Sequence, residues 1–415
     1  MIENLLSEVT KAARIEIENR GDCELLSSLI LEETDQFISY NTLRRLYGLA
    51  PGGKPRRQTL DALALFSGYV DYRNFCSTQP KLNLWKRKAE LSHLLAESNF
   101  TETVEWFKGV EGQLFKLDLL LTAMRELYLS NRDQDMIQLL DSGAYDIENQ
   151  SYSYQIQVAV SLGLLIREQP LDGRFGLLSH PKMVEAVYLR LVDYSALNGY
   201  YGHWTRELQL SPPTHESAVF IHCLIQLIAF LNCEQLPSID MDNLRVHPCP
   251  SALLGRIFTV YLMQGDPRSF DQLWQDLLSQ DSEEGFDITA YIEPRTFALA
   301  TANRPLAKWL IDQIKINELT LKQFQIHELH VHFLLNALHS IFEEDHVQAT
   351  YWMGRFDVDE LRRPSFSEFL LFPLRRIQAE LNGTAHVFPD ELRDLNLRLG
   401  YAWFNEQFWF DFFEK

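Results

Sequence analysis

Apolar residues recur every three to four positions through most of the chain, which is the spacing of helices with one buried face. In the first part this pattern predicts four helices, over residues 1–19, 23–33, 40–47 and 60–66. The expected N-caps are Asp22, Ser39 and Thr59, and the expected helix breakers are Gly21, Gly48 and Gly68. Alternating strand patterns are scarce, so the sequence predicts an all-α fold.

Beyond residue 80 the pattern changes to short helices that alternate with longer ones. The longer helices are expected at residues 113–130, 152–168, 182–198, 214–232, 319–342 and 365–382. The short ones carry large apolar pairs: Trp106-Phe107, Leu139-Leu140, Leu273-Trp274, Trp309-Leu310 and Trp352-Met353. These pairs are 33, 134, 36 and 43 residues apart, and 134 is close to four units of about 34 residues. Two irregular connectors are expected, residues 171–181 and, with three prolines, residues 232–250.

The region from Ile38 to Gly68 contains a recognisable motif. Its parts are Ser39-x-x-Thr42-Leu43-x-Arg45-Leu46-x-Gly48, a basic loop with proline, and Thr59-Leu60-x-x-Leu63-Ala64-x-x-x-Gly68. This succession resembles the helix-turn-helix module of the phage-repressor type. It is also similar to an N-terminal module that precedes helical repeats in bacterial proteins. The segment from Thr34 to Ile38 departs from that family, because it is longer than the usual tight turn and has no glycine.

The resemblance implies that the helix beginning after Ser39 enters the major groove of DNA. Ser39, Tyr40, Asn41, Arg44 and Arg45 would then lie against the DNA, with Asn41 suited to adenine and Arg44 to guanine. The loop residues Lys54, Arg56 and Arg57 would contact phosphates. The alternative stays open: Arg44 and Arg45 lie on a solvated face, and the module is an adaptor that touches no DNA.

The short-long alternation near 34 residues is similar to a degenerate tetratricopeptide-type array, in which stacked hairpins form a solenoid with a concave groove. We therefore expect a helix-turn-helix-like domain over residues 1–80. A helical repeat domain over residues 81–415 is expected to follow, with a possible break near residues 233–250. The run from Tyr401 to Phe413 contains eight aromatic residues. It is interpreted as a capping helix docked on the last hairpin, with an exposed partner-binding face as the alternative.

The formal net charge of −19 is unevenly distributed. Residues 1–90 contain 13 Lys and Arg against 12 Asp and Glu, which leaves 25 against 45 for the rest of the chain. Between residues 41 and 88 there are ten basic residues and only two acidic ones, Asp61 and Asp71. A basic region that suits phosphates therefore precedes a long acidic body, which favours basic or amphipathic partners.

The composition indicates the class of protein and the compartment to which the chain belongs. Hydrophobic residues make up 46% of the chain, which is ample for a packed core. The five cysteines are scattered without a CxxC motif, which indicates a reducing compartment rather than disulfides or a thiolate zinc site. The acidic N-terminus differs from a signal peptide, and the apolar run 217–233 contains four polar residues, so it is expected to be a buried helix. We expect a cytoplasmic protein without a membrane segment.

No pattern of catalytic chemistry emerges. The histidines His327, His330 and His332 lack HExxH spacing, and His332 points away from the face that the other two share. Gly52-Gly53-Lys54 lacks the spacing of a phosphate-binding loop. We expect no enzyme activity, no metal and no cofactor. The expected function is regulatory, with duplex DNA bound near residues 39–57 and a peptide or protein bound by the repeats. The alternative is a protein-binding scaffold.

Overall fold

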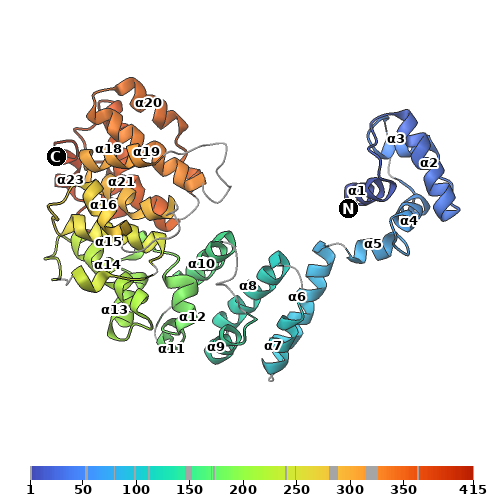
Figure 1. The fold of residues 1–415 in the computed structure, drawn as a ribbon, viewed down its shortest axis with the longest axis horizontal. Helices are drawn as coiled ribbons and strands as arrows, with labels where there is room; N and C mark the ends of the chain where they lie inside the picture. Colours follow the sequence, from blue (N-terminus) through green and yellow to red (C-terminus); the bar gives the residue numbers. More distant parts are fainter. Residues whose placement is uncertain are drawn as a thin grey trace. The chain divides into compact units, whose positions relative to one another are not determined.

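The structure is a computed structural model, and it describes residues 2–51, 55–78, 80–97, 100–110, 113–144, 152–169, 171, 173–238, 241–247, 249–279, 288–314, 326–361 and 364–414. Every regular element in these ranges is helical, as Figure 1 shows, and none is a strand. The predicted all-α class is therefore confirmed. The chain divides into two compact units, residues 1–123 and 124–415. The boundary expected near residue 80 coincides with the start of a helix inside the first unit.

The first unit contains seven helices and the beginning of an eighth among its described residues. They are α1 (Ile2–Ala13), α2 (Arg20–Thr34), α3 (Tyr40–Leu46), α4 (Arg57–Phe66), α5 (Tyr72–Thr78), α6 (Pro80–Ala96), α7 (Phe100–Lys108) and α8 (Gln113–Leu129).

The N-terminal helices α1 to α5 pack around one apolar core. Leu5, Leu26, Leu43, Leu63 and Phe75 come from these five helices in turn, and none of their side chains is exposed. For α3, the spacing of apolar positions therefore identified the buried side of the helix correctly.

The boundary between the first two helices differs from the prediction. Helix α1 ends at Ala13, and α2 begins at Arg20 with Asn19 as its N-cap. The Asn19 side chain accepts hydrogen bonds from the N–H groups of Gly21 and Asp22, and Asp22 accepts one from the Asn19 N–H at 3.0 Å. This reciprocal capping box starts the helix one turn early. Asp22 is thus not the N-cap, and Gly21 lies inside the first turn instead of ending a helix.

The next two helices, α3 and α4, agree in part with the predicted caps. Ser39 caps α3 as predicted, accepting a hydrogen bond from the Thr42 N–H, and Gly48 has the expected left-handed backbone with φ of 74°. Thr59 is not the N-cap of α4, which was a wrong prediction. The helix begins at Arg57, because the extended backbone of Arg56 already turns into the helix there.

The second unit contains the remainder of α8 and fifteen further α-helices among its described residues. They are α9 (Asp133–Asp141), α10 (Tyr152–Arg167), α11 (Phe175–Leu178), α12 (Pro181–Met183), α13 (Tyr200–Leu210), α14 (His215–Leu231), α15 (Ser251–Met263), α16 (Phe270–Ser279), α17 (Ile292–Thr301), α18 (Arg304–Gln313), α19 (Ile326–Phe342), α20 (His346–Arg355), α21 (Pro364–Leu381), α22 (Asp390–Leu399) and α23 (Glu406–Asp411).

The long helix predicted over residues 182–198 is wrong. The chain instead passes from α12 into a π-helical turn, η1 (Val184–Tyr188), and later a 3-10 turn, η2 (Tyr194–Ala196). Asp193 begins η2, where its carboxylate accepts hydrogen bonds from the backbone N–H and the hydroxyl of Ser195. Because Asp193 is buried, these local bonds and its distant partners decide the backbone path, and the apolar spacing does not.

The C-terminal aromatic run is docked, as interpreted from the sequence. Phe408, Trp409 and Phe412 of this run are buried, and the Trp409 indole N–H donates to the Ala385 carbonyl at 2.8 Å. The run also contributes Phe404, whose ring stacks on Phe372 of α21 at 4.2 Å between ring centres. The aromatic residues thus close the end of the core.

The apolar run 217–233 forms most of α14, which is largely buried. Its polar residues are used inside the fold: Ser217 completes a capping box with Thr214, and the Gln226 amide donates to the Pro237 carbonyl at 2.7 Å. Among the described residues, no helix combines the length and apolar character that crossing a bilayer requires.

Candidate nucleic-acid interface

The connection between α2 and α3 determines the position of α3 against α2. Asp35 ends α2 in the left-handed conformation, with φ of 55°, and its N–H donates to the Leu31 carbonyl at 3.0 Å. Aspartate adopts this conformation more readily than most residues, which explains how the connection turns without a glycine. The buried Ser27 hydroxyl donates to the Ile38 carbonyl at 2.5 Å and ties the connection back to α2. Helix α3 is therefore held firmly against α2.

Helix α3 has one buried side and one exposed side. Leu43 is fully buried, and the Tyr47 hydroxyl just beyond the helix donates to the Leu6 carbonyl at 3.2 Å. Asn41 and Arg45, one turn apart, are exposed on the other side. Arg44 is half-buried beside them, with a guanidinium N–H that donates to the Asn41 side-chain oxygen at 3.5 Å. Three of the predicted base-contacting residues thus lie together.

Two other predicted contact residues have internal partners. The Ser39 hydroxyl, besides its capping bond, lies 2.9 Å from the Thr42 hydroxyl. The Tyr40 ring is half-buried, and the Arg20 guanidinium lies 4.8 Å from its centre, itself paired with Glu24 at 2.7 Å. Ser39 and Tyr40 therefore position α3. The roles of Arg20 and Ser27 were missed, because no local pattern reveals a contact between neighbouring helices.

The predicted phosphate contacts lie at the start of α4. Arg56 and Arg57 are both exposed, and Arg57 lies 3.8 Å from Asp61. Asp61 also accepts a hydrogen bond from the Tyr72 N–H at 3.0 Å, so it is anchored to α5. Lys54 lies outside the described residues. In the described part of the chain, no hydrogen bond or ion pair joins this pair of arginines to α3.

Most arginines of α3 and of the start of α4 have no acidic partner among the described residues. Among the described residues, no carboxylate lies within 4.0 Å of the guanidinium groups of Arg44, Arg45 or Arg56. A guanidinium without a carboxylate partner keeps its full capacity for phosphate oxygens or guanine edges. By contrast, two basic residues of α6 have acidic partners: Arg87 pairs with Glu90 at 3.0 Å and Lys88 with Asp118 at 2.7 Å.

Apolar side chains are exposed on α2 and in the connection between α2 and α3. Phe37, in the connection before α3, is 72% exposed, and Leu25 and Leu31 on α2 are exposed as well. The hydrophobic pattern of α2 includes Leu25 among the expected core residues, so this part of the prediction is wrong. The physical reason is helical spacing: Cys23, Leu26 and Ile30, three and four residues apart, share the buried side of α2, and Leu25 lies off that side.

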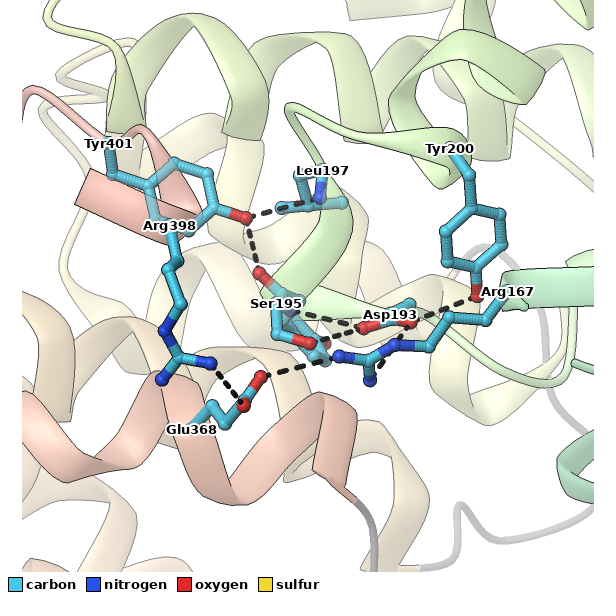
Figure 2. A network of polar contacts seen from close by, with 9 residues as sticks. Arg167, Asp193, Ser195, Leu197, Tyr200, Glu368, Arg398 and Tyr401 are labelled. Atoms are coloured by element: carbon cyan, nitrogen blue, oxygen red, sulfur yellow. Dashed lines mark hydrogen bonds and ion pairs between the residues drawn. The ribbon is translucent and has the colours of Figure 1, made fainter. Parts of the chain in front are cut away.

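A polar cluster in the second unit links helices that are far apart in the sequence. Figure 2 shows Asp193 at its centre, with the Tyr200 hydroxyl donating to its carboxylate at 2.9 Å and Arg167 at 3.7 Å. Arg167 also reaches Glu368 of α21, which pairs in turn with Arg398 of α22. Burial, and then the negative Asp193, raise the pKa of Tyr200 far above its ordinary value, so this hydroxyl stays protonated. The contacts of this cluster join α10, α13, α21 and α22.

The histidine-rich helix α19 does not assemble ligands in its described part. The His330 ring accepts a hydrogen bond from the Asp357 N–H at 2.8 Å, and His332 is buried. Among the described residues, no group of three or more His, Cys, Asp or Glu side chains is placed to hold a metal ion. The side chain of His327 lies outside the described residues.

Comparison with known proteins finds no protein-family model, curated protein or solved structure that matches the chain.

Proposed function

We propose that this protein is a regulatory binding protein whose first unit binds duplex DNA and whose second unit binds a peptide or protein. The observation that carries the first part is the exposed side of α3. It presents Asn41, Arg44 and Arg45 together, on a helix held from behind by a fully buried leucine. A short, rigidly supported helix with amide and guanidinium groups on its outer side suits the major groove.

The polar groups divide into two roles under this proposal. Asn41 and Arg45 read base edges, since they are exposed one turn apart, and Arg44 supports Asn41 through their hydrogen bond. Arg56 and Arg57 contact phosphates, which orient the unit without reading sequence. The acidic second unit opposes nucleic acid, so DNA binding belongs to the basic region alone.

The second part of the proposal rests on the sequence of helices after residue 123. Short helices such as α18 and α20 flank the longer α19 in the chain and pack against it. We interpret this succession as a tetratricopeptide-like solenoid, whose groove binds a peptide or protein. Its acidic charge favours a basic partner.

Fluorescence anisotropy of the full chain with labelled duplexes of mixed sequence, at low salt, tests the DNA proposal. Binding should weaken steeply as salt is raised, because phosphate contacts release counterions. Absence of binding at tens of micromolar protein would refute it.

A scaffold function is the second candidate, and the exposed Phe37 favours it. A large aromatic side chain that is 72% exposed suits contact with a protein partner. If the first unit is an adaptor, replacing Phe37 with Ser removes partner capture from a native lysate, while Arg45→Ala leaves it unchanged. The reverse result favours the DNA-binding function.

A further inference from the structure

Helix α20 carries few charges on its outer face. The helix packs on α19, beside it in Figure 1, and buries Ala349. Helical periodicity places Val347, Tyr351 and Gly354 on the opposite side. Val347 is 83% exposed and Tyr351 is 51% exposed. The outward face of a surface helix ordinarily carries several charged side chains. Here the single one is Arg355, one turn after Tyr351, whose guanidinium donates to the Tyr351 hydroxyl at 3.2 Å and lies 4.6 Å from the centre of the Phe333 ring.

Gly354 separately indicates that another molecule can contact α20. Glycine weakens a helix relative to alanine, so a helical glycine usually has a packing reason. A Cβ atom added at Gly354 would meet nothing within 4 Å, which shows that the described fold does not require a glycine there. The open space allows the backbone of another molecule to approach α20 closely.

Acidic residues flank this face at both ends. Glu344 and Asp345 precede α20, Asp357 and Asp359 follow it, and all four are exposed. Asp345 caps α20, and Asp357 accepts a hydrogen bond from the Asp359 N–H, but no cation pairs with any of the four among the described residues. From residue 343 to residue 360 there are six Asp and Glu against one Arg, a net charge of −5. An occupant of this face therefore gains from positive charge at both of its ends.

We propose that the face formed by Val347, Tyr351 and Gly354, the α20 face, binds a helical segment of a partner protein that is apolar in its middle and basic at both ends. Helix α20 has ten residues and is about 15 Å long, so the two basic ends of the partner are separated by about ten residues of helix. Apolar side chains of the partner pack on Val347 and Tyr351, and its backbone lies closest at Gly354. This inference rests on the partner-binding part of the proposed function and is independent of DNA binding.

A designed peptide provides the probe. It is a fluorescein-labelled helix of about 18 residues, with leucines at helical spacing and lysine pairs in its first and last turns. Fluorescence anisotropy with the full chain should show binding that weakens as salt is raised. The same peptide with glutamates in place of the lysines should not bind. Equal binding of the two peptides, or no binding of the lysine peptide at hundreds of micromolar protein, would overturn the proposal.

Substitutions locate the site. Val347→Gln and Gly354→Gln should each weaken binding of the lysine peptide about tenfold, equivalent to about 1.4 kcal/mol. Leu397→Gln is the matched control, because Leu397 is a similarly exposed aliphatic residue on α22, and it should leave the affinity unchanged. Gly354→Gln should also raise the thermal midpoint, since glutamine is the better helix former, which separates lost binding from lost folding.

Unchanged affinity in both variants would show that the peptide binds elsewhere and would overturn the assignment. DNA binding measured on the same variants should equal that of the unmodified protein. Failure of DNA binding and failure of peptide binding are therefore read from separate titrations.

Discussion

The buried carboxylate of Glu293 should contribute strongly to the stability of the second unit. Glu293 of α17 is 5% exposed, and it accepts a hydrogen bond from the Tyr194 hydroxyl. Its other partner is the Arg256 guanidinium, 3.5 Å away. Arg256 is 8% exposed and lies 4.1 Å from the centre of the Phe220 ring. The carboxylate thus balances a positive charge that is largely shielded from water.

We predict that Glu293→Ala destabilises the second unit by about 3–5 kcal/mol, because it leaves Arg256 buried without a counter-charge. Each kcal/mol lowers the thermal midpoint of a domain of this size by about 2–4 °C, so the midpoint should fall by about 10 °C. Replacing both partners, Arg256→Met with Glu293→Met, removes the unpaired charge and should cost far less than Glu293→Ala alone. Tyr194→Phe removes one hydrogen bond to a charged group, a loss of about 1.5–3 kcal/mol.

Urea unfolding followed by circular dichroism and tryptophan fluorescence measures these differences. Glu391→Ala is the control, because Glu391 forms an exposed ion pair with Arg375 at 2.8 Å and should contribute less than about 1 kcal/mol. The reasoning fails if Glu293→Ala lowers the free energy of unfolding no more than Glu391→Ala does. It also fails if the double methionine replacement lowers it by as much as the sum of the two single methionine replacements, because the buried pair is then not coupled.

Three further predictions concern the first unit and the pH response. Replacing both Arg56 and Arg57 with alanine should weaken DNA binding about equally for all sequences and flatten the salt dependence in anisotropy titrations; a change of sequence preference would contradict a phosphate role. Asn41→Ala or Arg45→Ala should instead reduce discrimination between duplexes by about 1–3 kcal/mol per lost base contact, measured by competition, and equal losses for all duplexes would count against base reading. Burial, and then the positive Arg295, lower the pKa of His332 to about 4, so its folded form resists protonation and stability is lost as pH falls from about 6.5 towards 4. Urea unfolding should lose about 2 kcal/mol between pH 7 and pH 5 through this group, and His332→Asn should remove that part of the slope.

The sequence alone determined the fold class and much of the first unit. Apolar spacing predicts α3 and its buried Leu43, and the cap at Ser39 and the glycine at position 48 follow from local backbone chemistry. These features depend on neighbours within a few residues, so a single chain reveals them. The cluster of Asn41, Arg44 and Arg45 could be anticipated for the same reason, since three positions within five residues share one side of a helix.

Only the tertiary structure decided which polar groups already have partners within the fold. Arg20 lies over the Tyr40 ring, and Asp193, bound by Tyr200 and Arg167, interrupts a stretch whose apolar spacing predicts a continuous helix. The Glu293 and Arg256 side chains meet across 37 residues, and Arg167 reaches Glu368 across 201. A buried polar group must find its partner wherever the packed chain brings one, and periodicity records which side of a helix is apolar but not which distant residue faces it.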